Sequence, residues 1–247
     1  MRLTVSYSLA NKYLPLDYRR GFASLLKESL KKANSNLFTR YYEKSHVLKP
    51  FTFSVYFPEL MGEEEGRFNV GTRAILNFST TSYELGTSIY NGLLGHRSFP
   101  LFDNTLQLIH INLRPAIVLR QESAVFKTMA PVLVNNKGNA EWYLLPGDDG
   151  FDEGLSFTIN ELAHAFLGNV DARIEFQPMR IQRKVVRHYN MDMQGFTGIF
   201  ELRGRPDVLN LIYRVGLGVR RSQGFGMLEL VKQGSSSGHN DLGGESQ

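Results

Sequence analysis

Four side chains that could move protons or stabilise negative charge lie within the segment 42–49. These are Tyr42, Lys44, His46 and Lys49. Attack of a ribose 2′-hydroxyl on its neighbouring phosphate requires a base, an acid for the leaving oxygen and a cation beside the developing charge. Histidine, tyrosine and lysine supply these groups without a metal ion. The segment therefore predicts an acid–base site, although His46 could also be an ordinary loop histidine.

A glycine-rich stretch near the carboxyl end could hold a polyanion. It contains Gly216, Gly218, Arg220, Arg221, Ser222, Gly224 and Gly226. Glycine adopts positive φ at little cost, and its bare N–H groups can face phosphate oxygens. The stretch follows a helical pattern, so it fits neither the P-loop nor the dinucleotide motif, both of which precede a helix. A plain turn with solvated arginines is the alternative interpretation.

Further basic residues form a second candidate RNA-binding set. They comprise Lys27 on an amphipathic helix and the group Arg180, Arg183, Lys184 and Arg187 on the strand-like segment 174–189. In a regular strand, Arg183 and Arg187 share one face while Arg180 and Lys184 share the other. A bend or bulge would be needed to aim all four in one direction. His188, at the end of this segment, could also contact RNA.

The elements that must position these residues follow the same order twice. In the first half, the expected elements are a strand over 1–9, helices over 17–33 and 36–42, strands over 51–57 and 67–80, a helix over 83–94 and a strand over 99–113. In the second half, they are strands over 116–120 and 132–134, a helix over 153–167, strands over 174–189 and 195–202, a helix from Pro206 and a strand over 227–231. Strand–helix–strand–strand–helix–strand is the ferredoxin-like order. We therefore predict an α+β protein.

The predicted division is a first domain over 1–118, a second over 119–232 and a disordered tail over 233–247. The tail carries Asp241 and Glu245 but no lysine or arginine, so the body is more basic than the net charge of +4. A moderate positive excess suits a polyanion partner. No apolar run approaches the roughly 18 residues of a membrane helix, and there is no cysteine. These features predict a cytoplasmic protein without a cofactor or a dedicated metal site.

The glycine-rich stretch resembles the loop of the RAMP superfamily of CRISPR-associated proteins. Its pattern is Gly-x-Gly-x-x-x-Ser-x-Gly-Phe-Gly-x-x-Glu over 216–229. Lys49-Pro50-Phe51-Thr52-Phe53-Ser54 near the front resembles, more narrowly, the sixth Cas family, the endoribonucleases that cut CRISPR precursor RNA within its repeats. Segments 129–134 and 195–198 match in the same order. The resemblance covers residues 1–232 and implies two tandem ferredoxin-like (RRM-like) folds ending in the glycine-rich loop.

The resemblance also implies an activity. It places a catalytic histidine at His46, ahead of the Phe-Thr-Phe-Ser strand, in a metal-independent nuclease that leaves a 2′,3′-cyclic phosphate and a 5′-hydroxyl. Family members often carry a tyrosine in the first helix, which is absent here, so Tyr42, Tyr41 or Lys27 could take its place. Lys44 or Lys49 would stabilise charge.

The expected partner is CRISPR repeat RNA, either a hairpin or an unstructured repeat, with other Cas effector subunits as further candidates. We expect the enzyme to be a monomer or a homodimer in a prokaryotic cytoplasm. One alternative is a non-catalytic RAMP subunit that binds CRISPR RNA. Another is a generic ferredoxin-like domain that binds a protein or a small ligand.

Overall fold

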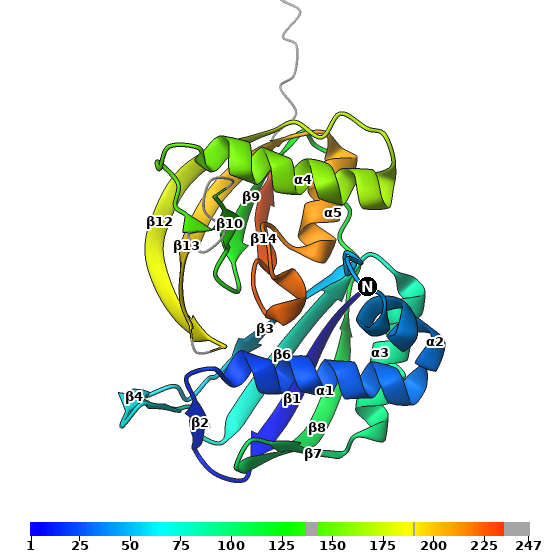
Figure 1. The fold of residues 1–247 in the computed structure, drawn as a ribbon, viewed down its shortest axis with the longest axis vertical. Helices are drawn as coiled ribbons and strands as arrows, with labels where there is room; N and C mark the ends of the chain where they lie inside the picture. The colour runs from blue at the N-terminus through cyan, green and yellow to red at the C-terminus, as the bar shows by residue number, and fades with distance from the viewer. Residues whose placement is uncertain (137–142, 190, 235–247) are drawn as a thin grey trace, which may run out of the picture.

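The first half of the chain forms a five-stranded antiparallel sheet with helices on one face, and a separate three-stranded sheet (Figure 1). The computed structural model describes residues 1–136, 143–189 and 191–234. Elements of the first half are β1 (Arg2–Leu9), β2 (Tyr13–Pro15), α1 (Tyr18–Ala33), α2 (Ser35–Phe38), the π-helical turn η1 (Thr39–Glu43), β3 (Phe51–Tyr56), β4 (Gly62–Glu64), β5 (Arg67–Asn69), β6 (Arg73–Thr80), α3 (Tyr83–Gly95), β7 (Ser98–Leu101) and β8 (Asn104–Arg114).

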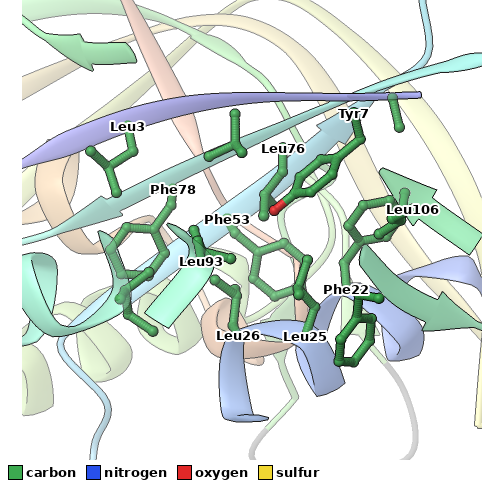
Figure 2. Packing of buried hydrophobic residues seen from close by; sticks show 14 of the residues in the cluster. Leu3, Tyr7, Phe22, Leu25, Leu26, Phe53, Leu76, Phe78, Leu93 and Leu106 are labelled. Atoms are coloured by element: carbon green, nitrogen blue, oxygen red, sulfur yellow. The ribbon is translucent and has the colours of Figure 1, made fainter. Parts of the chain in front are cut away.

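The strand order of the first sheet is β3-β6-β1-β8-β7. Helices α1 and α3 cover one face of this sheet, because their apolar stripes recur every three to four residues. On α1 the buried stripe includes Phe22, Leu25 and Leu26, while Lys31 and Lys32 complement the carboxyl end of the helix. Figure 2 shows the apolar side chains of this stripe packed against Phe53, Phe78 and other buried residues of the sheet.

The second half repeats the arrangement. Its elements are β9 (Ser123–Thr128), β10 (Val134–Asn135), β11 (Tyr143–Leu144), α4 (Phe151–Leu167), β12 (Ile174–His188), β13 (Met191–Gly204), α5 (Pro206–Val215), the 3-10 turn η2 (Arg221–Gln223) and β14 (Leu228–Gln233). The main sheet has the order β12-β13-β9-β14, and its core lies beneath α4 and α5. Pro206 occupies the first turn of α5, where no backbone donor is needed. Strand, helix, two strands, helix and strand occur in both halves, as predicted.

The start of the second half differs from the prediction. Residues 116–120 form no strand, and β9 begins only at Ser123. Segment 132–134 was predicted as a strand, but it contributes a single bridge, Val132 to Phe196, and the short β10. Short apolar runs do not reveal whether a neighbouring strand is within pairing distance. In the predicted tail, Gln233 still belongs to β14, whereas residues 235–247 lie outside the described residues. The division at residue 118 stays a prediction.

The glycine-rich loop between α5 and β14 lies where the two halves meet (Figure 1). Two side chains of the first half bind its backbone, and a third binds the first residue of β14. The Arg2 guanidinium donates to the Leu228 carbonyl (2.7 Å), Arg19 Nε to the Gly224 carbonyl (3.3 Å) and Thr52 Oγ1 to the Phe225 carbonyl (2.8 Å). The loop is therefore a buried structural connection between the halves.

Candidate functional site

Two lysines from distant segments meet on the ring of Tyr42. The Nζ atom of Lys49 lies 4.6 Å from the ring centroid, and that of Lys27, from α1, lies 5.7 Å from it. An ammonium within about 6 Å of an aromatic face is attracted by the ring quadrupole. The structure thus brings together three of the residues that were singled out in the sequence, and it concentrates positive charge beside the segment that carries His46.

A widened helical turn aims Tyr42 at these lysines. After α2, the chain continues into η1, in which the Lys44 N–H donates to the Thr39 carbonyl, five residues back (3.3 Å). Such π-type turns occur often at functional sites. The Tyr42 ring stacks on Phe38, with centroids 5.5 Å apart. The Nζ atom of Lys31 lies 5.6 Å from the centroid of the Phe38 ring, and that of Lys27 lies 5.8 Å from it. The stacked rings of Phe38 and Tyr42 therefore form the aromatic surface on which the lysines lie.

Phe38 and Lys31 were missed in the sequence. For Phe38, the sequence did contain an indication, because Phe38 and Tyr42 are four residues apart and so share one helical face. The segment reads equally well as a short apolar helix face, so spacing alone could not assign Phe38 a place in the site.

His46 and Lys44 lie at the surface, in the chain segment between Tyr42 and Lys49. Both are exposed in the turn between η1 and β3, and the backbone of His46 has φ 58°. A residue with a side chain rarely adopts this left-handed conformation, and such strain occurs often at functional sites. An exposed imidazole can reach an incoming substrate and exchange protons with water. The structure does not bring His46 or Lys44 onto the Tyr42 ring.

Burial changes the acidity of two groups in the cluster. The pKa of Lys49 is lowered, first by burial and then by the positive charge of Lys27. Burial raises the pKa of the Tyr42 hydroxyl, which therefore stays protonated at neutral pH. A lysine with a lowered pKa gives up a proton more readily than an ordinary surface lysine. The cluster can hold positive charge near a phosphate and can also donate a proton.

The four loop glycines are required by packing rather than by close approach to a phosphate. All four are buried with positive φ, and three of their N–H groups donate within the protein: Gly216 to Ile212, Gly224 to Arg221 and Gly226 to Pro131. A Cβ atom at Gly226 would meet the Leu217 carbonyl oxygen at 2.0 Å, and one at Gly218 would meet that of Leu133 at 2.2 Å. The predicted phosphate cradle is therefore wrong for these N–H groups.

The two loop arginines differ from each other. Arg221 is buried and donates to the Val215 carbonyl at the end of α5 (3.1 Å), and burial lowers its pKa to about 10. Only 7% of Arg221 is exposed, so its side chain packs inside the protein, and its phosphate contact stays a prediction. Arg220 is half-buried and donates to the Tyr143 hydroxyl (2.6 Å) and to Gln223 Oε1 (3.2 Å). Ser222 is half-buried beside it.

The basic strand keeps its two faces. Arg180, Arg183, Lys184 and Arg187 are all exposed on β12, an edge strand. The bulge in this strand lies between Pro178 and Arg180, and the register is continuous from Arg180 to His188, so nothing aims all four in one direction. Lys184 and Arg187 nevertheless line one groove of about 510 Å³, opposite Tyr18 and Arg19 of α1. His188 is buried and does not reach the surface.

Within the described part of the chain, no three histidine, aspartate or glutamate side chains converge as a metal site would require. Over the same residues, the helices are too short or too polar to cross a membrane.

The resemblance seen in the sequence is confirmed by comparison with known proteins. Residues 114–230 match the family described as CRISPR associated protein Cas6, C-terminal. A curated relative, the CRISPR-associated endoribonuclease Cas6 of Pyrococcus furiosus, is 25% identical over 233 residues, which cover 88% of this chain and 83% of the relative.

Solved structures confirm the fold class. A Cas6-related protein of Pyrococcus furiosus superimposes with a TM-score of 0.83 at 19% identity, covering 95% of this chain and 99% of that one. A RAMP protein that binds different RNA substrates gives 0.82 at 18% identity, covering 94% and 100%. At these identities the likeness concerns the fold, which is the tandem ferredoxin-like arrangement.

Proposed function

We propose that this chain is a metal-independent endoribonuclease that cuts CRISPR precursor RNA within its repeats to give mature guide RNA. The observation that carries the proposal is the meeting of Lys27 and Lys49 on Tyr42, at the two ends of the chain segment that carries the exposed His46. The similarity to endoribonucleases of the Cas6 family supports the substrate class. The enzyme acts in a prokaryotic cytoplasm, as a monomer or a homodimer, and passes its product to Cas effector subunits.

In the proposed reaction, His46 takes the proton of a ribose 2′-hydroxyl. The 2′-oxygen then attacks the adjacent phosphorus, and the bond from phosphorus to the 5′-oxygen breaks, leaving a 2′,3′-cyclic phosphate and a 5′-hydroxyl. Lys49 and Lys27 stabilise the negative charge that develops on the phosphate oxygens. The 5′-oxygen takes its proton from Lys49 or from the Tyr42 hydroxyl, and Lys44 lies close enough in sequence to add charge on the solvent side.

Cleavage of the host's labelled repeat RNA in EDTA tests this proposal. We expect the wild-type protein to cut and His46→Ala to lose a factor of about 10² to 10⁴ in rate, as expected for loss of a general base or acid. A repeat with a single 2′-deoxy sugar at the cut site should resist cleavage completely. His164, exposed on α4, provides the control variant His164→Ala.

Tight repeat binding without cleavage by the wild-type protein would overturn the nuclease proposal and favour the non-catalytic RAMP subunit. Weak binding with no preference for the repeat would favour the generic ferredoxin-like domain.

A further inference from the structure

A buried cluster of polar side chains joins three segments that lie far apart in the sequence. Asp17 precedes α1, His188 ends β12 and Gln223 belongs to the glycine-rich loop. His188 Nδ1 lies 2.8 Å from Asp17 Oδ1, and Nε2 lies 3.2 Å from Gln223 Oε1. The Tyr189 N–H donates to the second Asp17 oxygen (3.0 Å). Only 1% of the His188 side chain is exposed.

Both ring nitrogens of His188 face oxygen atoms of other segments. Nδ1 faces a carboxylate oxygen of Asp17, and Nε2 faces the amide oxygen of Gln223. Arg220 Nη1 lies 3.2 Å from the same Gln223 oxygen, and because arginine has donors only, this contact fixes the orientation of the amide. His188 and Asp17 thus form a buried hydrogen-bonded pair between the halves.

The Asp17 side chain contacts His188 instead of capping α1. Asp17 occupies the N-cap position of α1, where an aspartate side chain ordinarily accepts from the first turn and stabilises the helix. Here its side chain makes no capping hydrogen bond. Tyr189, which follows His188, has φ 48°, a conformation that is strained in residues other than glycine. The missing helix cap and the strained backbone of Tyr189 are both unfavourable for local stability. We infer that the contact between the halves has a role other than local stability.

The pair lies beside a groove that residues of both halves line. Lys184 and Arg187 lie within four residues of His188 on β12, and Tyr18 and Arg19 directly follow Asp17 on α1. These four residues line the same groove of about 510 Å³. Since β12 is an edge strand, it pairs on one side only, with β13. The contact of His188 with Asp17 attaches the end of this strand to the start of α1.

We propose that His188 is a positioning residue for RNA binding. Its hydrogen bond with Asp17 holds β12 against α1, so that Lys184 and Arg187 contact phosphates of the RNA segment that also crosses the first half of the protein. This inference rests on the proposed function, because it takes RNA as the ligand. His188 itself does not touch the RNA.

The test is the salt dependence of binding to labelled repeat RNA, measured by fluorescence anisotropy. Each phosphate contact adds roughly 0.7–0.9 to the slope of log K against log salt. We expect His188→Gln and Asp17→Asn to lower that slope by roughly 1.5 to 2, as does the double variant Lys184→Ala/Arg187→Ala. Adding His188→Gln to the double variant should change nothing further. The control, His164→Gln, should bind like the wild type.

A slope equal to that of the wild type in folded His188→Gln would overturn the proposal. So would losses that add when His188→Gln is combined with the double variant, because additivity indicates independent effects. Circular dichroism and thermal melting establish that each variant is folded. Asp17→Asn keeps the shape of the side chain and serves where His188→Gln does not fold.

Distance measurements give a second, independent readout. The chain has no cysteine, so Lys12→Cys and Gln182→Cys, both exposed, can carry a single FRET pair across the groove. We expect His188→Gln to broaden the distance distribution, and an unchanged distribution would contradict the proposal. Failure of the wild-type protein to bind repeat RNA would instead overturn the proposed function, so the two failures are distinguishable.

Discussion

Lys49 Nζ lies 4.6 Å from the centre of the Tyr42 ring, and the two residues belong to different elements. Tyr42 lies in the π-helical turn, while Lys49 directly precedes the Pro50–Phe51 entry into β3. The face of the ring, rather than the hydroxyl, makes this contact. The contact gives Lys49 a fixed position while leaving its ammonium free to meet a phosphate.

Substitution of Tyr42 separates the ring from the hydroxyl. We expect Tyr42→Phe to keep the cleavage rate within about tenfold, far less than the 10² to 10⁴ that a lost general acid costs. Tyr42→Leu removes the platform for both lysines and should lose clearly more than Tyr42→Phe. Single-turnover cleavage rates at saturating protein measure both variants. A larger loss in Tyr42→Phe than in Lys49→Ala would identify the hydroxyl as the acid.

The charge of Lys27 affects the pH dependence of cleavage. Lys27 lowers the pKa of Lys49, so Lys27→Ala should raise that pKa toward the ordinary lysine value. Charged Lys49 is present only below its pKa, and the rate that depends on it falls as the pH rises through that value. The alkaline limb of the rate profile should therefore move to higher pH in Lys27→Ala.

The control for this shift is Lys32→Ala. Lys32 lies on the same helix, but its ammonium donates to the Gly95 carbonyl instead. An equal shift of the alkaline limb in both variants would point to a general charge effect and would contradict a specific pairing of Lys27 with Lys49.

Two glycines with nearly the same φ should respond differently to alanine. Gly226 has φ 69° and an added Cβ would meet the Leu217 carbonyl oxygen at 2.0 Å, whereas Gly66 has φ 73° and nothing within 4 Å. Left-handed strain alone costs about 1–2 kcal/mol, and overpacking adds typically about 1–3 kcal/mol. Denaturant unfolding should therefore show a larger loss in Gly226→Ala. Equal losses would show that the loop yields to the added atom.

Replacement of Arg221 should lower stability without changing phosphate contacts. Arg221→Met removes a buried donor from the Val215 carbonyl, which costs roughly 1–3 kcal/mol. Because Arg221 is 7% exposed, the salt slope of RNA binding should stay at the wild-type value. Lys184→Ala, on the exposed strand, should do the opposite and lower the slope by about one. A reduced slope in folded Arg221→Met would show that the loop rearranges to bind RNA.

Local pattern was sufficient for most elements. The spacing of Phe22, Leu25 and Leu26 predicts α1, and Pro206 predicts the start of α5, because helix periodicity and proline geometry depend only on neighbouring residues. The order of the elements in turn predicts the ferredoxin-like class twice. The strand at 116–120 was wrong, since an apolar run pairs only where a partner strand lies within reach.

The amino-acid pattern alone was enough to predict the elements, the residue types available for acid–base chemistry and the basic strand. The contacts of those residues follow from the fold, because contacts between segments far apart depend on which surfaces meet. The fold places Lys27 near Lys49 on the Tyr42 ring, turns His188 inward to Asp17 and buries Arg221. Glycine allows the close approach of either a phosphate or another backbone segment. The sequence does not distinguish the two, and only the residues packed against the loop show that its glycines accommodate neighbouring backbone.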